Sequence, residues 1–226
     1  MKPQFVYDAV IFDMDGLMLD TERIGFEGFC YAYHLQGFNG REDFFKTLIG
    51  TNVKDANAAM LKIFGPDFPI DQIRKDRQVY VSKVKKESGI PVKKGLHTLL
   101  RYLKKRRIPL AIASSSSREV VHENLTSVGV AGYFSMYLCG DEITHGKPHP
   151  EIYLNTAKKL KLNPKKIIVM EDSFPGITAA HAAGMIPFMV PDMHVPTDSI
   201  RQKAYRVFDS LEEVKTYLEE LDAEKL

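Results

Sequence analysis

Two pairs of carboxylates follow short apolar runs of the sequence. Asp13 and Asp15 come directly after one run, and Glu171 and Asp172 come directly after another. Carboxylates this close together repel one another unless a cation lies between them, and a hard divalent ion with oxygen ligands meets that need. Asp13 could then act as a nucleophile while Asp15 exchanges a proton with a leaving group. The two pairs favour metal-assisted chemistry, although each pair alone could be no more than a polar strand end.

Two further segments carry groups that can bind a phosphate. Ser114 and Ser115 follow an apolar run and precede a predicted helix, and hydroxyl and main-chain N–H groups near a helix N-terminus bind phosphate readily. Lys147 lies in a loop stiffened by Pro148 and Pro150, and its point charge could neutralise a carboxylate nucleophile and an incoming phosphate. Serine runs also fill loops and a lone lysine is usually solvated, so these signals gain weight only beside the acidic pairs.

Apolar runs alternate with amphipathic stretches of helical length. The sequence predicts strands at residues 9–12, 110–113, 137–139, 167–170 and 186–190, with a weaker candidate at 206–208. It predicts helices between and after them at residues 95–106, 118–128, 151–160, 175–183 and 210–221, the last with a capping box of Ser210 and Glu213. Several strands are apolar on both faces, as parallel strands covered by helices are. The pattern predicts an α/β fold with a doubly wound, mostly parallel sheet of the Rossmann type.

In such a sheet, ligands bind at the carboxyl ends of the strands. The two acidic pairs, the serines and the lysine all fall at predicted strand ends or in the loops that follow them. We therefore expect these side chains, far apart in the sequence, to converge around one cation.

Residues 21–91 interrupt the alternation. They contain helical patterns at residues 22–35, 53–64 and 70–86 and no convincing buried strand. We interpret residues 21–91 as a helical cap domain inserted into an α/β core formed by residues 1–20 and 92–226. The hinges are expected near residues 16–21 and 89–93, and cap closure would exclude bulk water from the reaction.

Composition excludes several other classes of function. The chain has 226 residues and a net charge of +2, from 31 basic and 29 acidic side chains, so no strong field would recruit nucleic acid. Only two cysteines are present, Cys30 and Cys139, which favours a reducing compartment over a disulfide framework. No signal-like segment is visible, and no apolar run approaches the roughly 18 residues of a membrane span. We expect a cytoplasmic monomer without a membrane partner.

Taken together, the motifs resemble those of a haloacid dehalogenase superfamily phosphatase with a small helical cap. The resemblance covers essentially the whole chain and is carried by Asp13-Met14-Asp15-Gly16, Ser114, Gly146-Lys147-Pro148 and Glu171-Asp172-Ser173. Other segments, including Asp20-Thr21-Glu22-Arg23, resemble the subgroup of β-phosphoglucomutases and pseudouridine-5′-phosphatases. This subgroup points to a small phosphorylated metabolite, such as a sugar or nucleoside monophosphate, as the substrate.

The resemblance implies a role for each matching residue. Asp13 would attack phosphorus, and Asp15 would protonate the leaving group and then activate water. Mg²⁺ would be held by Asp13, the main-chain carbonyl of Asp15 and Asp172, with Glu171 in or beside that shell. The phosphoryl group would be held by Ser114, the N–H of Ser115 and Lys147.

Two rival functions differ in the residues that they require. The mutases carry a histidine after the Asp-Thr of the hinge and an arginine in the cap, where this chain has Gly25 and Val53. Both departures favour hydrolysis over a phosphomutase activity. A non-catalytic phospholigand-binding protein would be expected to lose the nucleophile or the general acid, and both are present here.

The cap is expected to select the leaving group. We expect Asn52, and a basic side chain from Lys75 or Arg77, to touch it, although solvated helix positions are the simpler explanation of this basic pair. His145 and His149 flank Lys147, and they could contact substrate or lie in solvent.

Overall fold

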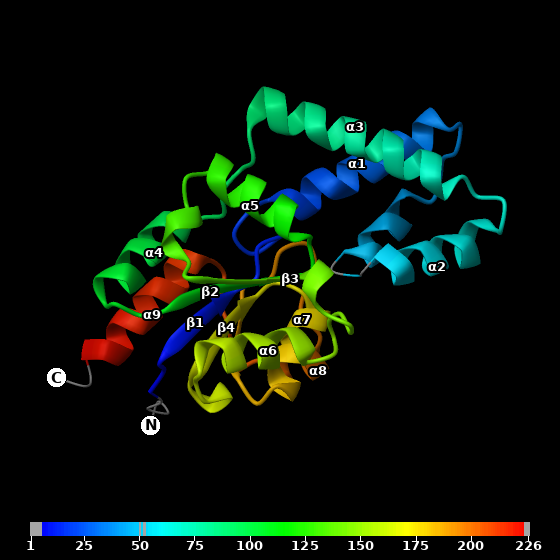
Figure 1. Ribbon diagram of the computed structural model, residues 1–226. Coiled ribbons are helices and arrows are strands. Elements are labelled where there is room, and N and C mark those ends of the chain that lie inside the picture. Colours follow the sequence, from blue (N-terminus) through cyan, green and yellow to red (C-terminus); the bar gives the residue numbers. More distant parts are fainter. Residues whose placement is uncertain (1–5, 50, 52, 224–226) are drawn as a thin grey trace.

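The computed structural model describes residues 6–49, 51 and 53–223 (Figure 1). The strands of these described residues form a six-stranded sheet in the order β3-β2-β1-β4-β5-β6, and every neighbouring pair is parallel. The strands are β1 (Ala9–Phe12), β2 (Leu110–Ser114), β3 (Met136–Cys139), β4 (Ile167–Glu171), β5 (Ile186–Met189) and β6 (Arg206–Val207). The order reverses at β1, which is the arrangement of a doubly wound sheet. The predicted fold class is confirmed.

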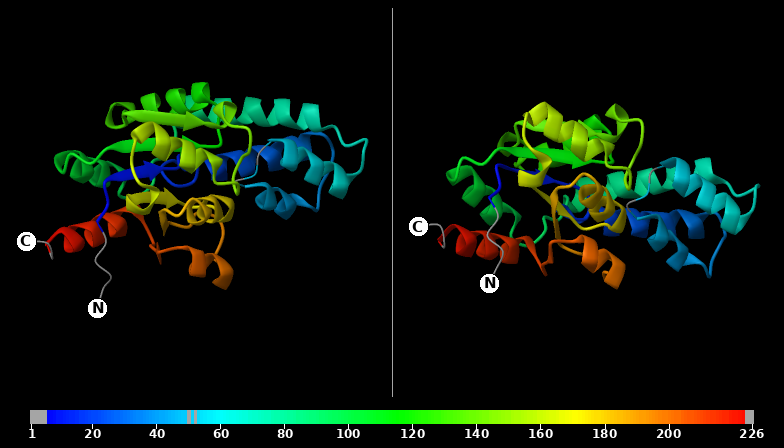
Figure 2. Two further views of the ribbon diagram at one scale, coloured as in Figure 1. Left: turned by 60° about the horizontal axis from the view of Figure 1, so that its bottom comes forward. Right: turned by 90° about the horizontal axis from the view of Figure 1, so that it is seen from below.

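Helices cover both faces of the sheet, as the two further views show (Figure 2). Side chains of β1 alternate between the faces, because successive residues of a strand point to opposite sides. Val10 and Phe12 share one apolar cluster with residues of α4, α5 and α9, whereas Ala9 and Ile11 share another with residues of α6 and α7. The helices of the core are α4 (Leu96–Lys105), α5 (Arg118–Ser127), α6 (Glu151–Leu160), α7 (Phe174–Ala182), α8 (Asp198–Lys203) and α9 (Leu211–Ala223).

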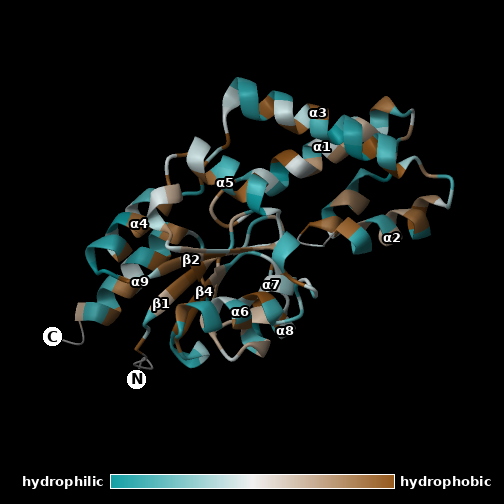
Figure 3. Cartoon of the chain, viewed as in Figure 1, coloured by the Kyte–Doolittle hydropathy of each residue, from teal (hydrophilic) through white to brown (hydrophobic). Residues whose placement is uncertain are grey.

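The strands β1 and β4 are brown in Figure 3 because their residues are apolar apart from Glu171 and are buried along their whole length, whereas much of the helix surface is teal. Helices such as α4 bury an apolar stripe and expose polar side chains. In α4 the stripe consists of four leucines at helical spacing, all fully buried: Leu96, Leu99, Leu100 and Leu103. No helix of the described residues is both long and apolar enough to span a bilayer.

Between β1 and β2 the chain forms a helical layer beyond the strand ends (Figure 1). It comprises α1 (Thr21–Leu35), the short 3₁₀ helix η1 (Glu42–Leu48), α2 (Val53–Phe64) and α3 (Ile70–Ser88). Its aromatic side chains pack around a core of their own, in which the rings of Phe64 and Phe68 stack at 4.4 Å and Tyr33 contacts both. This separate core supports the assignment of residues 21–91 to a cap.

The two chain crossings between cap and core lie side by side. The N–H of Asp20 donates to Pro91 at 2.9 Å, and the N–H of Lys93 donates to Met18 at 2.9 Å. The Lys93 ammonium lies 3.5 Å from the Asp20 carboxylate and also bonds Asp192. The crossings are therefore tied to each other and to the loop after β5.

Some local structure differs from the sequence-based expectation. The helices η1 and α8 and the one-turn helices η2 (Ala131–Tyr133), η3 (Gly140–Glu142) and η4 (Pro164–Lys166) are not predicted, since each is short. The capping box is half formed. The Ser210 hydroxyl accepts from the Glu213 N–H at 3.3 Å, but the Glu213 carboxylate accepts from the N–H of Asp209.

Candidate active site

The predicted side chains meet at the carboxyl edge of β1, β2 and β4, where the strand order reverses. Asp13 and Asp172 directly follow β1 and β4, which are neighbours in the sheet, and Ser114 ends β2 on the other side of β1. Lys147 arrives on the loop between β3 and α6. Three short buried strands and one loop thus bring four polar groups to one place, which is why the spacing in the sequence could be so wide.

Lys147 is the centre of this cluster. Its ammonium group donates to Asp13 Oδ1 at 2.6 Å, to Glu171 Oε1 at 2.6 Å and to the carbonyl of Ala113 at 3.1 Å. These bonds use all three of its protons. Burial opposes the charge on Lys147, but the carboxylates of Asp13 and Glu171 outweigh it and raise the pKa of the lysine well above its ordinary value. Lys147 therefore stays charged beside Asp13.

Asp13 and Asp172 are both buried, at 6% and 5% exposure. Burial raises the pKa of Asp13, with added repulsion from Glu171 and Asp15, although Lys147 opposes the shift. Burial also raises the pKa of Asp172, and Glu171 and Asp13 add to it. Among the described residues Asp172 Oδ1 has no hydrogen-bond partner. Buried carboxylates with a free oxygen fit a hard divalent cation, which would replace the missing positive charge.

Gly16 allows the first loop to approach Asp172. Its φ is +81°, and a Cβ at this position would lie 2.2 Å from Asp172 Oδ2. Any other residue would push the carboxylate aside as well as strain the backbone. The glycine of the first motif is thus required by the position of the last one.

Asp15 is held by hydroxyl groups from two separate segments. The hydroxyl of Thr21, the first residue of α1, donates to Asp15 Oδ1 at 2.7 Å, and that of Ser116 donates to Oδ2 at 2.7 Å. Ser114 also donates to Oδ2, at 3.3 Å, and accepts from the N–H of Ser116. Ser116 and Thr21 were not predicted as site residues. Their position within a serine run and beside a hinge carries no signal that separates them from their neighbours.

The resemblance places Glu171 in or beside the metal shell, but in the structure its carboxylate is bonded to protein donors. It is fully buried, and its Oε1 accepts from Lys147 and from the phenol of Tyr153 at 2.9 Å. Its Oε2 accepts from both the N–H and the hydroxyl of Ser173, each at 2.9 Å. Burial raises the pKa of Tyr153, and the charge of Glu171 raises it further, so the phenol keeps its proton. With four donors around it, Glu171 is arranged to hold the ammonium group of Lys147.

A cavity of about 730 Å³ lies between these groups and the cap. Its core-side lining includes Asp13, Asp15, Ser115, Lys147 and Asp172. Its cap-side lining includes four basic side chains: Lys54, Arg74, Arg77 and Lys85. The volume is typical of a pocket for a small molecule.

The structure separates the expected cap residues. Arg77 lines the cavity, with its Nε donating to the carbonyl of Gly25 at 3.1 Å and its guanidinium 4.5 Å from the Phe29 ring centre. Lys75 is exposed and is not among the lining residues, whereas Arg74, which was not predicted, is. Positions 74 and 77 are three apart and share a helix face, which position 75 does not. Asn52 lies outside the described residues.

This fold and this edge site are those of a hydrolase that acts on phosphoric monoesters. The chain belongs to the family of haloacid dehalogenase-like hydrolases, whose model matches residues 10–190. A Thermotoga maritima protein named phosphorylated carbohydrates phosphatase is 31% identical over 182 residues, which are 79% of this chain and 82% of the relative. A Drosophila melanogaster protein named "Probable pseudouridine-5′-phosphatase" is 29% identical over 216 residues, 91% of this chain and 90% of the relative.

Solved structures agree with this assignment. The crystal structure of β-phosphoglucomutase from Clostridium difficile superposes with a TM-score of 0.78 at 25% identity, over 97% of this chain and 99% of that one. The family and the predicted enzyme class are confirmed.

Proposed function

We propose that the protein is a Mg²⁺-dependent phosphatase that hydrolyses a small phosphorylated metabolite through an aspartyl-phosphate intermediate, an acyl phosphate on Asp13. The observation that carries the proposal is the buried contact of 2.6 Å between Lys147 and Asp13 at the wall of the cavity. A carboxylate paired with a fixed ammonium group can approach an anionic phosphate, because the ammonium offsets the repulsion.

In the first half of the reaction, a carboxylate oxygen of Asp13 bonds to phosphorus as the bond from phosphorus to the substrate oxygen breaks. Asp15 gives its proton to that oxygen, which leaves as an alcohol. The hydroxyls of Thr21 and Ser116 fix the orientation of Asp15 during this transfer. Ser115, which lines the cavity, and Lys147 would hold the transferring group.

In the second half, Asp15 removes a proton from water, and the water oxygen attacks phosphorus. The acyl phosphate bond breaks, inorganic phosphate forms and the Asp13 carboxylate is restored. Both halves use the same two carboxylates, so the chain needs no further acid or base.

The residues present fit a magnesium ion. Asp13 and Asp172 would supply carboxylate oxygens and Asp15 its main-chain carbonyl, as the family resemblance implies. When bound, the ion would neutralise charge on the transferring phosphoryl group. The unpartnered Asp172 Oδ1 supports this assignment.

We infer that the substrate is a sugar or nucleoside monophosphate. The names of the relatives mention phosphorylated carbohydrates and pseudouridine-5′-phosphate. The basic cap side chains Lys54, Arg74, Arg77 and Lys85 can donate hydrogen bonds to the hydroxyl and carbonyl groups of such a leaving group. We also infer a monomer in the cytoplasm, in keeping with two free cysteines.

The phosphomutase alternative is favoured only by the structural likeness to a β-phosphoglucomutase. Gly25 stands where the mutases have a histidine, and a Cβ there would lie 2.6 Å from Arg77 Nη2. A histidine here would require the Arg77 guanidinium, which donates to the Gly25 carbonyl, to move. This packing supports hydrolysis.

The test is an assay of the purified protein on p-nitrophenyl phosphate and on a panel of sugar and nucleoside monophosphates. We expect release of inorganic phosphate with Mg²⁺ and none after chelation with EDTA, with activity restored by added Mg²⁺. Formation of an isomeric sugar phosphate in place of free phosphate would establish the mutase instead. A folded protein that turns over none of the panel would contradict both.

A further inference from the structure

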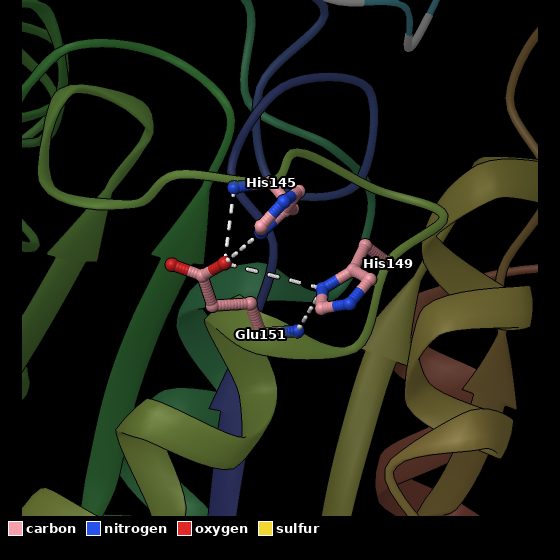
Figure 4. A group of neighbouring side chains, drawn as sticks. All are labelled: His145, His149 and Glu151. Atoms are coloured by element: carbon pink, nitrogen blue, oxygen red, sulfur yellow. Dashed lines mark hydrogen bonds and ion pairs between the residues drawn. The ribbon is translucent and has the colours of Figure 1, made fainter.

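Two histidines and a glutamate converge outside the cavity, on the loop that carries Lys147 (Figure 4). His145 Nδ1 lies 2.8 Å from Glu151 Oε2, and His149 Nδ1 lies 4.0 Å from the same oxygen. The two imidazole rings are 4.7 Å apart at an interplanar angle of 39°. One potential ligand atom from each residue lies within 4.8 Å of the other two. None of the three residues lines the catalytic cavity, so the proposed phosphatase reaction leaves the group unexplained.

The group is held in place by its surroundings. The Glu151 carboxylate, only 18% exposed, accepts from the N–H of Thr144 at 2.7 Å and from that of His145 at 3.0 Å. Pro148 and Pro150 restrict the backbone on either side of His149. The N–H of His149 donates to Gly146 at 3.0 Å and closes a turn. Backbone donors that orient a carboxylate are what a metal ligand commonly has behind it.

The geometry points to a binding site for a borderline divalent transition metal, of which Zn²⁺ is the model ion, formed by His145, His149 and Glu151. Imidazole nitrogen together with a carboxylate suits Zn²⁺, Ni²⁺ or Cu²⁺, whereas Mg²⁺ and Ca²⁺ prefer oxygen alone. Tetrahedral coordination at ~2.0–2.2 Å puts ligand atoms about 3.3–3.6 Å apart, between the two separations from Glu151 Oε2. His149 Nδ1 accepts from the N–H of Glu151 at 3.3 Å and would exchange this bond for the ion.

The site would be open to ions in solution. The side chains of His145 and His149 are 62% and 53% exposed, so an ion can reach both rings without unfolding the loop. Three protein ligands would leave at least one position for water. Its nitrogen ligands distinguish this site from the all-oxygen site at Asp13 and Asp172. His145 and His149 each lie two residues from Lys147 in the sequence.

A second group of potential ligands lacks these properties. Cys139, Asp141 and Glu142 also lie close together. However, burial raises the pKa of the Cys139 thiol to about 11, and the Glu142 carboxylate is paired with Arg118 at 2.7 Å. A neutral thiol is a poor ligand, since the thiolate is the form that binds metal.

The proposal is tested on the untagged full-length protein, which is first stripped of metal. Excess Mg²⁺ is then kept present to occupy the site at Asp13 and Asp172, so that zinc bound there is not counted. Zn²⁺ is added, the protein is dialysed, and bound zinc is measured by mass spectrometry of the elements. We expect one equivalent of zinc on the wild type and on His97→Ala, a matched change of an exposed histidine on α4. We expect none on the double variant His145→Ala/His149→Ala.

Co²⁺ gives an independent readout of the ligands. Its visible absorption should show low-coordinate cobalt with nitrogen ligands in the wild type and in His97→Ala, and the double variant should show only the spectrum of the free ion. Circular dichroism establishes that the double variant is folded, as expected because both rings are exposed. Equal zinc on the double variant and the wild type would overturn the proposal, as would a wild type that retains no zinc.

Discussion

The Lys147 ammonium and the Glu171 carboxylate lie 2.6 Å apart, with 3% and 0% of their side chains exposed. Tyr153 and Ser173 donate to the same carboxylate, so Glu171 cannot turn away from the lysine. A charged group buried this deeply is costly to leave unpaired, so the two side chains are held in one arrangement. Glu171 thus sets the position of the cation that stands beside Asp13.

Glu171→Gln should destabilise the protein. Breaking a buried ion pair costs ~3–5 kcal/mol, and we expect about 2–3 kcal/mol here because Asp13 remains as a partner of Lys147. Urea unfolding with saturating Mg²⁺ measures the change. The matched control is Glu219→Gln, which removes an exposed pair with Lys215 at 2.7 Å and should cost less than about 1 kcal/mol. Equal stability of the two variants would show that the buried pair has no special weight.

Asp13→Asn should abolish turnover and preserve the fold. The change replaces one oxygen at a polar edge and empties no core, whereas it removes the nucleophile. We expect the rate to fall by at least ~10³-fold. Phosphate release and the melting temperature are measured beside Asp67→Asn, an exposed position outside the cavity. Turnover of Asp13→Asn near the wild-type rate would rule out attack by Asp13.

Asp15→Asn should separate the two halves of the reaction. Without the acid and base, both steps slow by an expected ~10²–10⁴-fold. With a good leaving group such as p-nitrophenolate, hydrolysis of the acyl phosphate on Asp13 should be slowed most. Intact-protein mass spectrometry after mixing with substrate should then show one added phosphate. If Asp15→Asn carried no added phosphate and turned over substrate at the wild-type rate, Asp15 would have no part in the mechanism.

Mg²⁺ should stabilise the protein more as the pH rises. Burial raises the pKa values of Asp13 and Asp172, so the folded metal-free protein holds protons that the unfolded chain has lost above about pH 4. By linkage, the contribution of these groups to stability is greatest below that pH and falls as the pH rises through the folded pKa values. Mg²⁺ binds the deprotonated form and reverses the loss.

The measurement is the increase in melting temperature caused by Mg²⁺, taken at intervals from about pH 5 to pH 8. We expect the increase to grow over this range in the wild type and to be small and flat in Asp172→Asn. An increase of the same size in that variant would place the ion elsewhere.

Arg77 should contribute to substrate binding, and Lys75 should not. Arg77→Met removes a half-buried guanidinium from the cavity wall, and we expect KM to rise by roughly tenfold, the equivalent of one charge-assisted hydrogen bond of about 1.5 kcal/mol. Lys75→Met, two positions away and exposed, is the matched control and should leave KM unchanged. The comparison is made on the best substrate of the panel. Equal KM values in the two variants would exclude Arg77 from substrate binding.

The strands and the strand-end motifs could be predicted because each is encoded in a few consecutive residues. The network around Asp15 could not, since Ser116 is 101 residues away and looks like the other members of its serine run. Glu171 and Asp172 were placed together because they are adjacent. In extended backbone, however, adjacent side chains point to opposite sides, and Glu171 faces Gly176 of α7, where an added Cβ would lie 1.8 Å from its carboxylate.

The basic residues of the cap helix α3 show the same limit of prediction from sequence. Arg74, Lys75 and Arg77 are equally basic in sequence, and only the phase of α3 against α1 decides which of them reach the cavity. That phase depends on packing between segments some 50 residues apart, such as the contact of Arg77 with Gly25. Periodicity gives the face of a helix but not the neighbour that the face meets.

The approach of Gly16 to Asp172 bears on how this chain can vary over evolutionary time. Gly16 and Gly37 have the same φ of +81°, but a Cβ at Gly37 would meet nothing within 4 Å. Asparagine tolerates that backbone conformation, so position 37 can drift to it at little cost. Position 16 is closed to every side chain, and among active descendants of this sequence it should be invariant although it neither binds substrate nor takes part in the reaction through any side chain.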